Sequence, residues 1–276
     1  MREPQFYRRL AAVAPAAAPG SSVTRALRIL EAVAAAGDGV TPKAIARRLD
    51  CPLPTVYRAL GVLVEQGYLV RLHGVRGYGL GYRVAELHHS LAGQVRPPPA
   101  ARAVLHEVHL EVAAAGYLLV RRDGDVVVAH VDDCPEHPLP PGLRVGEPTA
   151  AHATAAGKVV LAGLRPARLA ELVARTGLPR LAAHTIADRR ALDRELRRIR
   201  ADGAAVEVEE YAAGVAGIAV PVTGADGEVV AGLGLSVSRA DFAARRWELE
   251  RALRQAGTRV SAALAEADRQ AATAHP

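Results

Sequence analysis

Residues 51–69 read "CPLPTVYRALGVLVEQGYL", and the polar side chains of this stretch stand near its front. Pro54 suits the first turn of a helix, because its φ is already fixed and its missing backbone N–H is not needed there. Four apolar residues follow with helical spacing and form one face: Val56, Leu60, Leu63 and Val64. Three polar residues share the rest of the first turn: Thr55, Tyr57 and Arg58. The pattern predicts a helix that starts at Pro54 and offers hydrogen-bonding side chains at its N-terminal end.

The segments around this helix predict a winged helix-turn-helix domain over residues 21–82. Upstream, "VTRALRILEAVAAAG" is typical of a helix that Ser22 caps and Gly37 ends. Its expected buried face consists of Val23, Ala26, Leu27, Leu30 and Val33. Thr41 caps a second helix, "PKAIARRL". After Gly67, which ends the third helix, "YLVRLHGVRGYGLG" alternates like two short strands around the tip "HGVRG".

The third helix of such a domain enters the DNA major groove, where short polar side chains and arginine reach base edges. The guanidinium of Arg58 can pair with two acceptors on a guanine, whereas Thr55 and Tyr57 suit phosphate or a thymine methyl group. Arg76, at the hairpin tip, faces the minor groove or its phosphates. The predicted DNA-binding residues are Lys43, Arg47, Arg48, Pro54, Thr55, Tyr57, Arg58 and Arg76. The alternatives are that Tyr57 packs partly against the hairpin, that Arg58 is only solvated, or that the domain binds a protein.

The distribution of charge supports an anionic partner for the N-terminal third. Residues 1–96 carry 13 Lys/Arg and 6 Asp/Glu, whereas residues 97–276 carry 22 and 23. A solvated basic face would give the same count. Two cysteines fit a reducing cytoplasm, and no apolar run reaches the roughly 18 to 20 residues of a membrane span. Residues 1–20 are read as a disordered Ala/Pro-rich tail, because Pro15 and Pro19 interrupt a weak imitation of a signal peptide. We therefore expect a cytoplasmic protein with no membrane contact.

The rest of the chain predicts a linker and a second domain. "YRVAELHHSLAGQV" is typical of a connecting helix, and "RPPPA" ends the linker assigned to residues 83–97. Residues 98–270 then mix helices with two strand pairs, one turning at Asp123-Gly124 and the other at "GADGE". A long helix from "FAARRWELERAL" closes the chain. This order predicts an α+β domain with an antiparallel sheet.

The motifs together resemble the isocitrate lyase regulator (IclR) family of bacterial transcription factors. The resemblance rests on "TPKAIARRLDCPLPTVYRAL", "LVEQGYLVR", "GEPTAAHATAAGKVVLAGL" and "VEVEEYAAGVAGIAVPVTGADGEVVAGLGLSVS", in this order. It implies a winged helix-turn-helix domain and a GAF-like effector-binding domain joined by a linker helix. It also implies a homodimer or a dimer of dimers on double-stranded, palindromic operator DNA. The implied effector is a small organic or aromatic acid, and family members act as repressors or activators.

The resemblance also implies where the effector binds. The family's "HATAxGK" segment falls on residues 152–158, where a helix start could offer backbone N–H groups to a carboxylate. Gly217 and Gly234 replace a frequent cysteine and a frequent serine, which predicts a roomier and less polar pocket for a larger ligand. Close strand packing is the alternative reason for these glycines. The implied effector-binding residues are Ala155, Ala156, Gly157, Glu207, Val215, Gly217, Gly234 and Ser236.

The sequence offers no catalytic arrangement. His106 and His109 lie three residues apart, but no HExxH motif or cysteine cluster accompanies them, so an exposed histidine pair is the simpler interpretation. "GLSVS" is not a GxSxG nucleophile motif, and "AAGK" lacks the glycine of a P-loop. We expect no enzyme, no cofactor and no metal. The alternative function is a ligand-independent DNA-binding or architectural protein whose C-terminal domain only oligomerises.

Overall fold

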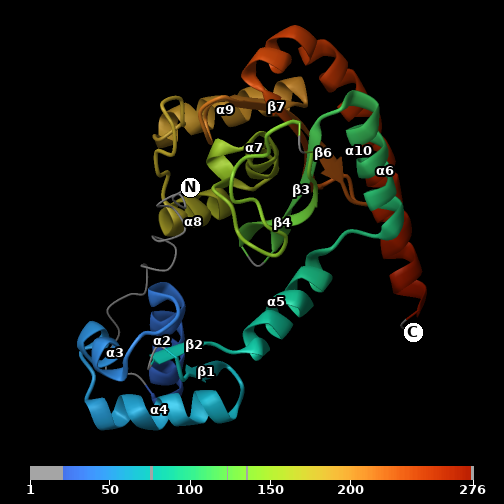
Figure 1. Cartoon of the computed structure of the whole chain (residues 1–276). Helices are drawn as coiled ribbons and strands as arrows, with labels where there is room; N and C mark the ends of the chain where they lie inside the picture. The colour runs from blue at the N-terminus through green and yellow to red at the C-terminus, as the bar shows by residue number, and fades with distance from the viewer. Residues whose placement is uncertain (1–20, 75–76, 123, 135, 275–276) are drawn as a thin grey trace. The chain divides into compact units, whose positions relative to one another are not determined.

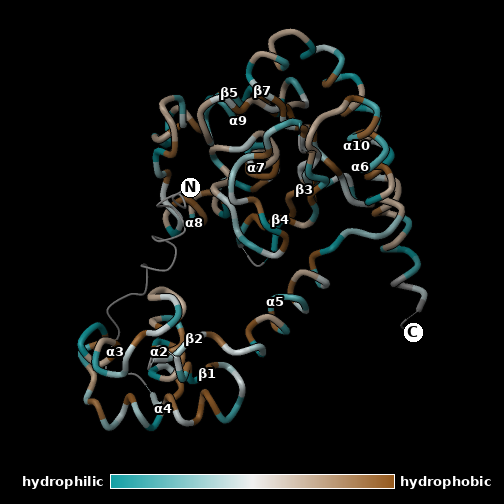
Figure 2. The backbone as a smooth tube through the Cα atoms, viewed as in Figure 1, coloured by the Kyte–Doolittle hydropathy of each residue, from teal (hydrophilic) through white to brown (hydrophobic). Residues whose placement is uncertain are grey.

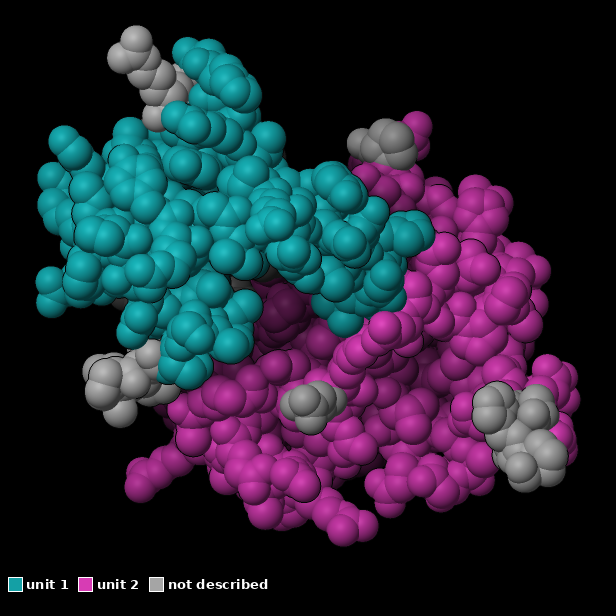
Figure 3. All heavy atoms as spheres, turned by 90° about the horizontal axis from the view of Figure 1, so that it is seen from below, with its two compact units in different colours: residues 1–91 teal, residues 92–276 magenta. Residues whose placement is uncertain are grey.

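The computed structural model describes residues 21–74, 77–122, 124–134 and 136–274 (Figure 1). The chain divides into two compact units, residues 1–91 and 92–276, which Figure 3 colours separately. The division falls inside α5 (Tyr82–Val95), the helix predicted as the linker. The tail predicted for residues 1–20 lies outside the described residues.

Within the described residues of the first unit, three helices precede a two-stranded hairpin, which confirms the predicted winged helix-turn-helix. The helices are α2 (Ser22–Ala36), α3 (Pro42–Leu49) and α4 (Leu53–Glu65). Strands β1 (Leu69–Leu72) and β2 (Gly77–Leu80) pair in antiparallel fashion. The alternation of apolar and polar residues along α4 is visible in Figure 2. The apolar side chains meet in one core made of Ile29, Ala32, Val33, Ile45, Val56, Leu60, Leu63 and Leu69.

Three local predictions about this unit are wrong. Helix α4 begins at Leu53, with Pro52 as its N-cap and Pro54 inside the first turn, because proline is tolerated at either of the first helical positions. Ser21, not Ser22, caps α2 by accepting a hydrogen bond from the Thr24 N–H at 3.2 Å. The buried face of α2 is formed by Ile29, Ala32 and Val33.

The helix α2 also leaves apolar side chains in solvent. Val23 is 66% exposed and Leu27 is 54% exposed, although their spacing predicted burial. Helices α3 and α4 pack against α2 in the core around Ile29, so only the flank that carries Val33 is covered. Periodicity predicts that a face is apolar, but the arrangement of neighbouring helices decides which part of it is covered.

The second unit is built on a five-stranded antiparallel sheet with the order β4-β3-β7-β6-β5. Its strands are β3 (Ala115–Arg122), β4 (Asp125–Asp132), β5 (Ala205–Val208), β6 (Val215–Thr223) and β7 (Val229–Ser238). The predicted strand pairs correspond to β3–β4 and β6–β7. This sheet and its helices confirm the predicted α+β class.

Helices cover both faces of this sheet (Figure 1). On one face, α6 (Pro99–Val112) and α10 (Arg239–Ala274) pack against side chains such as Leu233 and Leu235. On the other face lie η1 (Ala151–Ala153), α7 (Ala155–Ala162), α8 (Pro166–Thr176) and α9 (Arg189–Asp202). Because side chains alternate along a strand, Gly234 and Ser236 of β7 point to the side of α7.

Candidate DNA-binding surface and effector site

The front of α4 presents polar side chains to solvent while its back is buried. Tyr57 is 52% exposed, Arg58 and Pro54 are exposed, and Thr55 is half-buried. Val56 and Leu60 are fully buried in the core of the first unit. Within the described part of the chain, Arg58 forms no hydrogen bond or ion pair, so its guanidinium is available to a ligand outside the domain.

Helix α3 adds exposed positive charge next to α4. Lys43, Arg47 and Arg48 are all exposed on this helix. Thr41 caps α3 by accepting a hydrogen bond from the Ala44 N–H at 3.3 Å, as predicted. Asp50 follows with a positive φ of 47°, which turns the chain tightly between α3 and α4. Both α3 and α4 therefore carry their polar side chains on regular helical backbone.

The hairpin is held against the helices by a close backbone approach. The backbones of Val40 and Tyr78 form an antiparallel bridge, and a Cβ atom added to Gly77 would lie 2.2 Å from the backbone of Gly39. Only glycine allows the strand to cross the loop before α3 at this separation. Arg76, the predicted hairpin contact, lies outside the described residues.

The implied effector residues gather on the sheet face beneath α7. Across neighbouring strands, Glu207 pairs with Gly217, and Gly217 pairs with Ser236. Ala155, Ala156 and Gly157 form the buried start of α7 on the same face. A Cβ atom on Gly232 would lie 2.3 Å from the Ala156 carbonyl oxygen, so the helix start packs directly on β7. Val215 opens β6, one alternation away from Gly217.

Tyr117, a residue that sequence reasoning missed, fills the space beside Gly234. It lies on β3 directly opposite Gly234 and is fully buried. A Cβ atom on Gly234 would lie 2.6 Å from Cζ of the tyrosine ring, and one on Gly217 would lie 2.7 Å from the Leu235 carbonyl oxygen. The prediction of a roomier pocket at these two glycines is therefore wrong, and the alternative of close packing accounts for both. The only signal in the sequence was a lone hydroxyl in the apolar segment "AGYLLV".

Glu207 and Tyr117 place unpartnered polar groups in this buried site. Glu207 is 1% exposed, and neither its Oε atoms nor the Tyr117 hydroxyl forms a hydrogen bond of ordinary geometry with a described residue. The Tyr117 hydroxyl and the Ala155 N–H nevertheless lie close enough to lower the pKa of Glu207. Burial outweighs them, and outweighs the charge of Lys158, so the pKa of Glu207 is raised to about 8. Burial, helped by the Glu207 carboxylate, also raises the pKa of Tyr117 well above its usual range.

The buried Lys158 of α7 connects this helix to β5 and to Glu210. Lys158 is fully buried, and its Nζ donates to Glu210 Oε1 at 2.6 Å and to the Val206 carbonyl oxygen at 2.8 Å. Glu195 Oε1 lies 3.4 Å from the same nitrogen. Ser236, by contrast, donates its hydroxyl to the Pro138 carbonyl oxygen at 2.6 Å. Ser236 thus anchors the loop after β4 over the sheet.

The two other candidate pairs, His106 with His109 and Glu209 with Glu210, do not form a catalytic or metal-binding arrangement among the described residues. His106 and His109 stack with ring centroids 5.9 Å apart, and among the described residues no group of three or more His, Cys, Asp or Glu side chains is arranged to hold a metal. Glu209 pairs with Arg239 at 2.8 Å, while its neighbour Glu210 turns to Lys158. In the described part of the chain, no helix is both long enough and apolar enough to cross a membrane.

A winged helix-turn-helix domain followed by an α+β domain with a buried polar site defines the class of two-domain DNA-binding regulators. Residues 98–262 match the family model described as the bacterial transcriptional regulator IclR C-terminal domain, and residues 22–73 match the IclR helix-turn-helix domain. The chain belongs to the IclR family of bacterial transcriptional regulators. Both the predicted resemblance and the prediction that the protein is not an enzyme are confirmed.

Individual relatives agree with this assignment over most of the chain. The transcriptional regulator BhcR of Paracoccus denitrificans is 33% identical, over 78% of this chain and 76% of its own length. The solved IclR structure from Thermotoga maritima is 25% identical, with a TM-score of 0.69 over 88% of this chain and 98% of that one. An IclR homologue from Microbacterium hydrocarbonoxydans, solved as a complex with 4-hydroxybenzoate, is 26% identical, with a TM-score of 0.70 over 88% and 99% of the two chains.

Proposed function

We propose that this regulator binds operator DNA through α3 and α4, and that a small organic acid bound beneath α7 modulates this binding. The observation that carries the effector half is the set of buried, unpartnered polar atoms of Glu207 and Tyr117 at the start of α7. Each unpartnered buried polar group costs about 1–3 kcal/mol, a cost that a hydrogen-bonding ligand would remove. The Microbacterium homologue in complex with 4-hydroxybenzoate supports an acid of this kind.

The chemistry of the site favours an acid carrying a second polar group. The helix dipole at the start of α7 attracts a carboxylate, although the Gly157 N–H already donates to the Thr154 hydroxyl at 3.0 Å. A protonated Glu207 adds a hydrogen-bond donor, and the Tyr117 hydroxyl can donate or accept. Because the pKa of Glu207 is about 8, its carboxyl is mostly neutral at pH 7 and does not repel an anion. We expect the affinity for a carboxylate ligand to fall as the pH rises above 8.

In the DNA-binding half, each side chain has a different task. Arg58 reads a base edge, and Thr55 and Tyr57 beside it contact phosphate or a thymine methyl group. The exposed cations of α3 position the domain on the phosphate backbone without reading sequence. Arg76 keeps its proposed contact at the hairpin tip.

We further propose that the protein acts as a homodimer or a dimer of dimers. Two recognition helices on a palindromic operator must be about 34–36 Å apart, so two copies of the first unit are needed. The first unit leaves large apolar side chains in solvent that a second copy would cover: Val23 at 66%, Leu27 at 54%, Tyr82 at 67% and Leu87 at 57% exposed. Since α5 joins the units, an effector that moves it would change the spacing of the helices.

The experiment that tests this function measures binding of the purified protein to its own upstream intergenic DNA at several salt concentrations. We expect tight binding with a steep salt dependence, and weaker or stronger binding when 4-hydroxybenzoate or a related acid is added. A panel of such acids is screened in parallel for thermal stabilisation, because a ligand that binds only the folded state must raise its stability. Operator binding with no stabilisation by any acid in the panel would favour the ligand-independent alternative. Binding no tighter than to random DNA would refute operator recognition at that site.

A further inference from the structure

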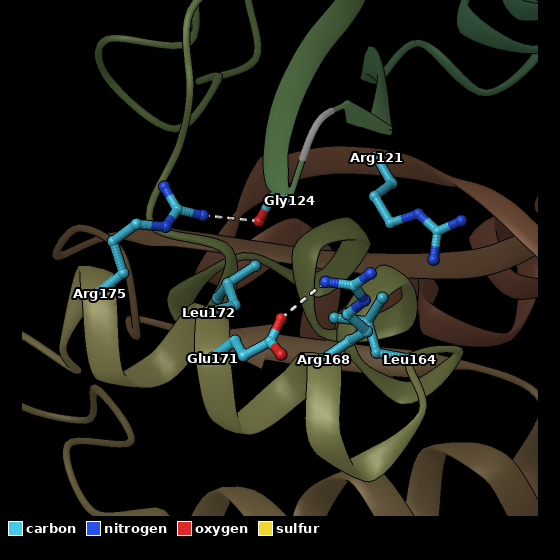
Figure 4. A pocket seen from close by; sticks show the side chains of 7 residues that line it. All are labelled: Arg121, Gly124, Leu164, Arg168, Glu171, Leu172 and Arg175. Carbon is cyan, nitrogen blue, oxygen red and sulfur yellow. Dashed lines mark hydrogen bonds and ion pairs between the residues drawn. The ribbon is translucent and has the colours of Figure 1, made fainter.

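A groove of about 460 Å³ lies between Arg121 and Gly124, near the ends of β3 and β4, and the helix α8 (Figure 4). Arg121, on β3, lines one side, and Arg168 and Arg175, on α8, line the other. Leu164 and Leu172 form its floor and are 7% and 8% exposed. The groove therefore combines guanidinium groups at its rim with an apolar floor.

The three arginines differ in how far their charges are already engaged. Arg175 is held in place, because it donates to Asp125 Oδ1 and to the Gly124 carbonyl oxygen, each at 2.7 Å. Arg168 has one partner, Glu171 Oε2, at 2.8 Å, and both side chains are mostly exposed. Arg121 forms no hydrogen bond or ion pair with any other described residue. Within the described part of the chain, the Arg121 guanidinium thus has no partner, and the Arg168 guanidinium is held only by a solvent-exposed ion pair, which contributes little to stability.

We propose that this groove is a second ligand site, which binds a small organic phosphate. A guanidinium presents two parallel N–H donors that match two phosphate oxygens, and a dianionic phosphate can engage two such groups at once. Arg121 supplies the first pair of donors, and Arg168 supplies the second by exchanging Glu171 for the phosphate. The leucine floor accommodates the apolar body of the ligand. Among the described residues, the acidic neighbours of the groove are Glu171 and Asp125, and Asp125 is already paired with Arg175.

The groove is separate from the effector site, although both border the same helix. The effector site lies at the N-terminal end of α7, whereas Leu164 follows its C-terminal end by two residues. Eight helical residues span about 12 Å. Leu164 and Leu172 pack in the same apolar core as α7, so a ligand in the groove rests on the core that positions the effector site.

The test titrates phenyl phosphate into the full-length protein by calorimetry, with benzyl alcohol and inorganic phosphate as separate probes. We expect phenyl phosphate to bind with a Kd near or below about 1 mM, and each of the other probes to bind more weakly, because each lacks one half of the ligand. Arg121→Ala should weaken phenyl phosphate binding about tenfold or more, as expected for the loss of a charge-assisted pair. Arg197→Ala, which removes another exposed arginine, on α9, should leave phenyl phosphate binding unchanged.

A second variant separates this site from a general effect of charge. Glu171→Gln frees Arg168 and should tighten phenyl phosphate binding several-fold. Glu111→Gln changes the net charge equally on α6, which covers the opposite face of the sheet, and should have no effect. The proposal is overturned if phenyl phosphate does not bind, if Arg121→Ala binds it like wild type, or if both glutamine variants respond alike. It is also overturned if Arg121→Ala weakens operator DNA binding instead, since the groove would then contact DNA phosphates.

Discussion

The start of α4 and the start of α7 are both helix N-termini that carry proposed binding residues, but they place their polar groups oppositely. At α4, Tyr57 and Arg58 stand in solvent on a helix whose other side is buried. At α7, the polar groups of Glu207, Tyr117 and Lys158 are buried, and they come from β5, β3 and the helix itself. Substitutions on an exposed binding surface therefore have little effect on the stability of the fold. In a buried binding site, the same atoms contribute both to stability and to ligand binding.

The two lysines of the chain give the largest expected contrast. Lys158→Ala removes the partner of a buried carboxylate and should lower the free energy of unfolding by about 3–5 kcal/mol. Lys43→Ala, on the exposed surface of α3, should change it by less than about 0.5 kcal/mol and should instead weaken DNA binding uniformly. Urea denaturation measures both. Equal effects of the two substitutions on stability would show that the buried network adds nothing.

Gly234, in the buried site, and Gly61, on the exposed side of α4, allow the same comparison for side-chain packing. Gly234→Ala forces a methyl group into the Tyr117 ring, 2.6 Å away, and should destabilise the protein by about 1–3 kcal/mol. Combining it with Tyr117→Ala, which vacates that space, should give a smaller loss than the sum of the two single changes. Gly61→Ala on α4 meets no atom within 4 Å and should stabilise by about 0.5–1 kcal/mol. Additive losses in the double variant would contradict the assignment of Tyr117 to this space.

Arg58→Ala should affect binding and leave folding unchanged. We expect a loss of about 1–3 kcal/mol in affinity for the specific operator, with a much smaller loss on random DNA. Arg28→Ala, on α2, removes the same charge from the same unit and is the matched control. Fluorescence anisotropy measures affinity, and thermal unfolding verifies that neither variant loses stability. An equal loss on both DNAs would assign Arg58 to the phosphate backbone.

The buried carboxyl of Glu207 predicts a pH dependence that the exposed surface lacks. Its pKa is about 8 when folded, against 4.5 for an ordinary glutamate, so the folded state holds a proton that the unfolded state has lost between these values. Stability therefore falls as the pH rises from about 5 to 8, by at most about 1.4 kcal/mol per pH unit for one group. Glu207→Gln should reduce the slope of stability against pH. The stability of this variant relative to wild type should therefore increase as the pH rises from about 5 to 8. Parallel pH profiles for the two proteins would contradict the assignment.

Local sequence signals predicted the first unit well because its determinants are short in range. Thr41 caps α3, the buried face of α4 follows helical spacing, and the strand alternation after Gly67 forms a hairpin. The errors arose where a neighbouring element decided the outcome. Val23 and Leu27 have the spacing of a buried face, but no described element of their unit covers them.

In the second unit, the residues implied by the family resemblance do meet on one sheet face, because antiparallel register aligns Glu207, Gly217 and Ser236. The packing around these residues could not be predicted from the sequence. Whether Gly217 and Gly234 open a pocket or pack against a neighbour depends on the adjacent strands. Tyr117, which packs against Gly234, is 117 residues away from it along the chain.

By itself, the sequence determined the class of each domain and the exposed polar front of α4, and with the family resemblance it predicted residues that lie together beneath α7. These follow from periodicity, capping and turn chemistry, which act over a few residues, and from motifs in a fixed order. Only the tertiary structure decided that Tyr117 closes on Gly234, that Lys158 neutralises Glu210, and that Arg121 faces α8 across a groove. These are contacts between distant segments, and their free energies depend on burial and distance, which no local pattern specifies.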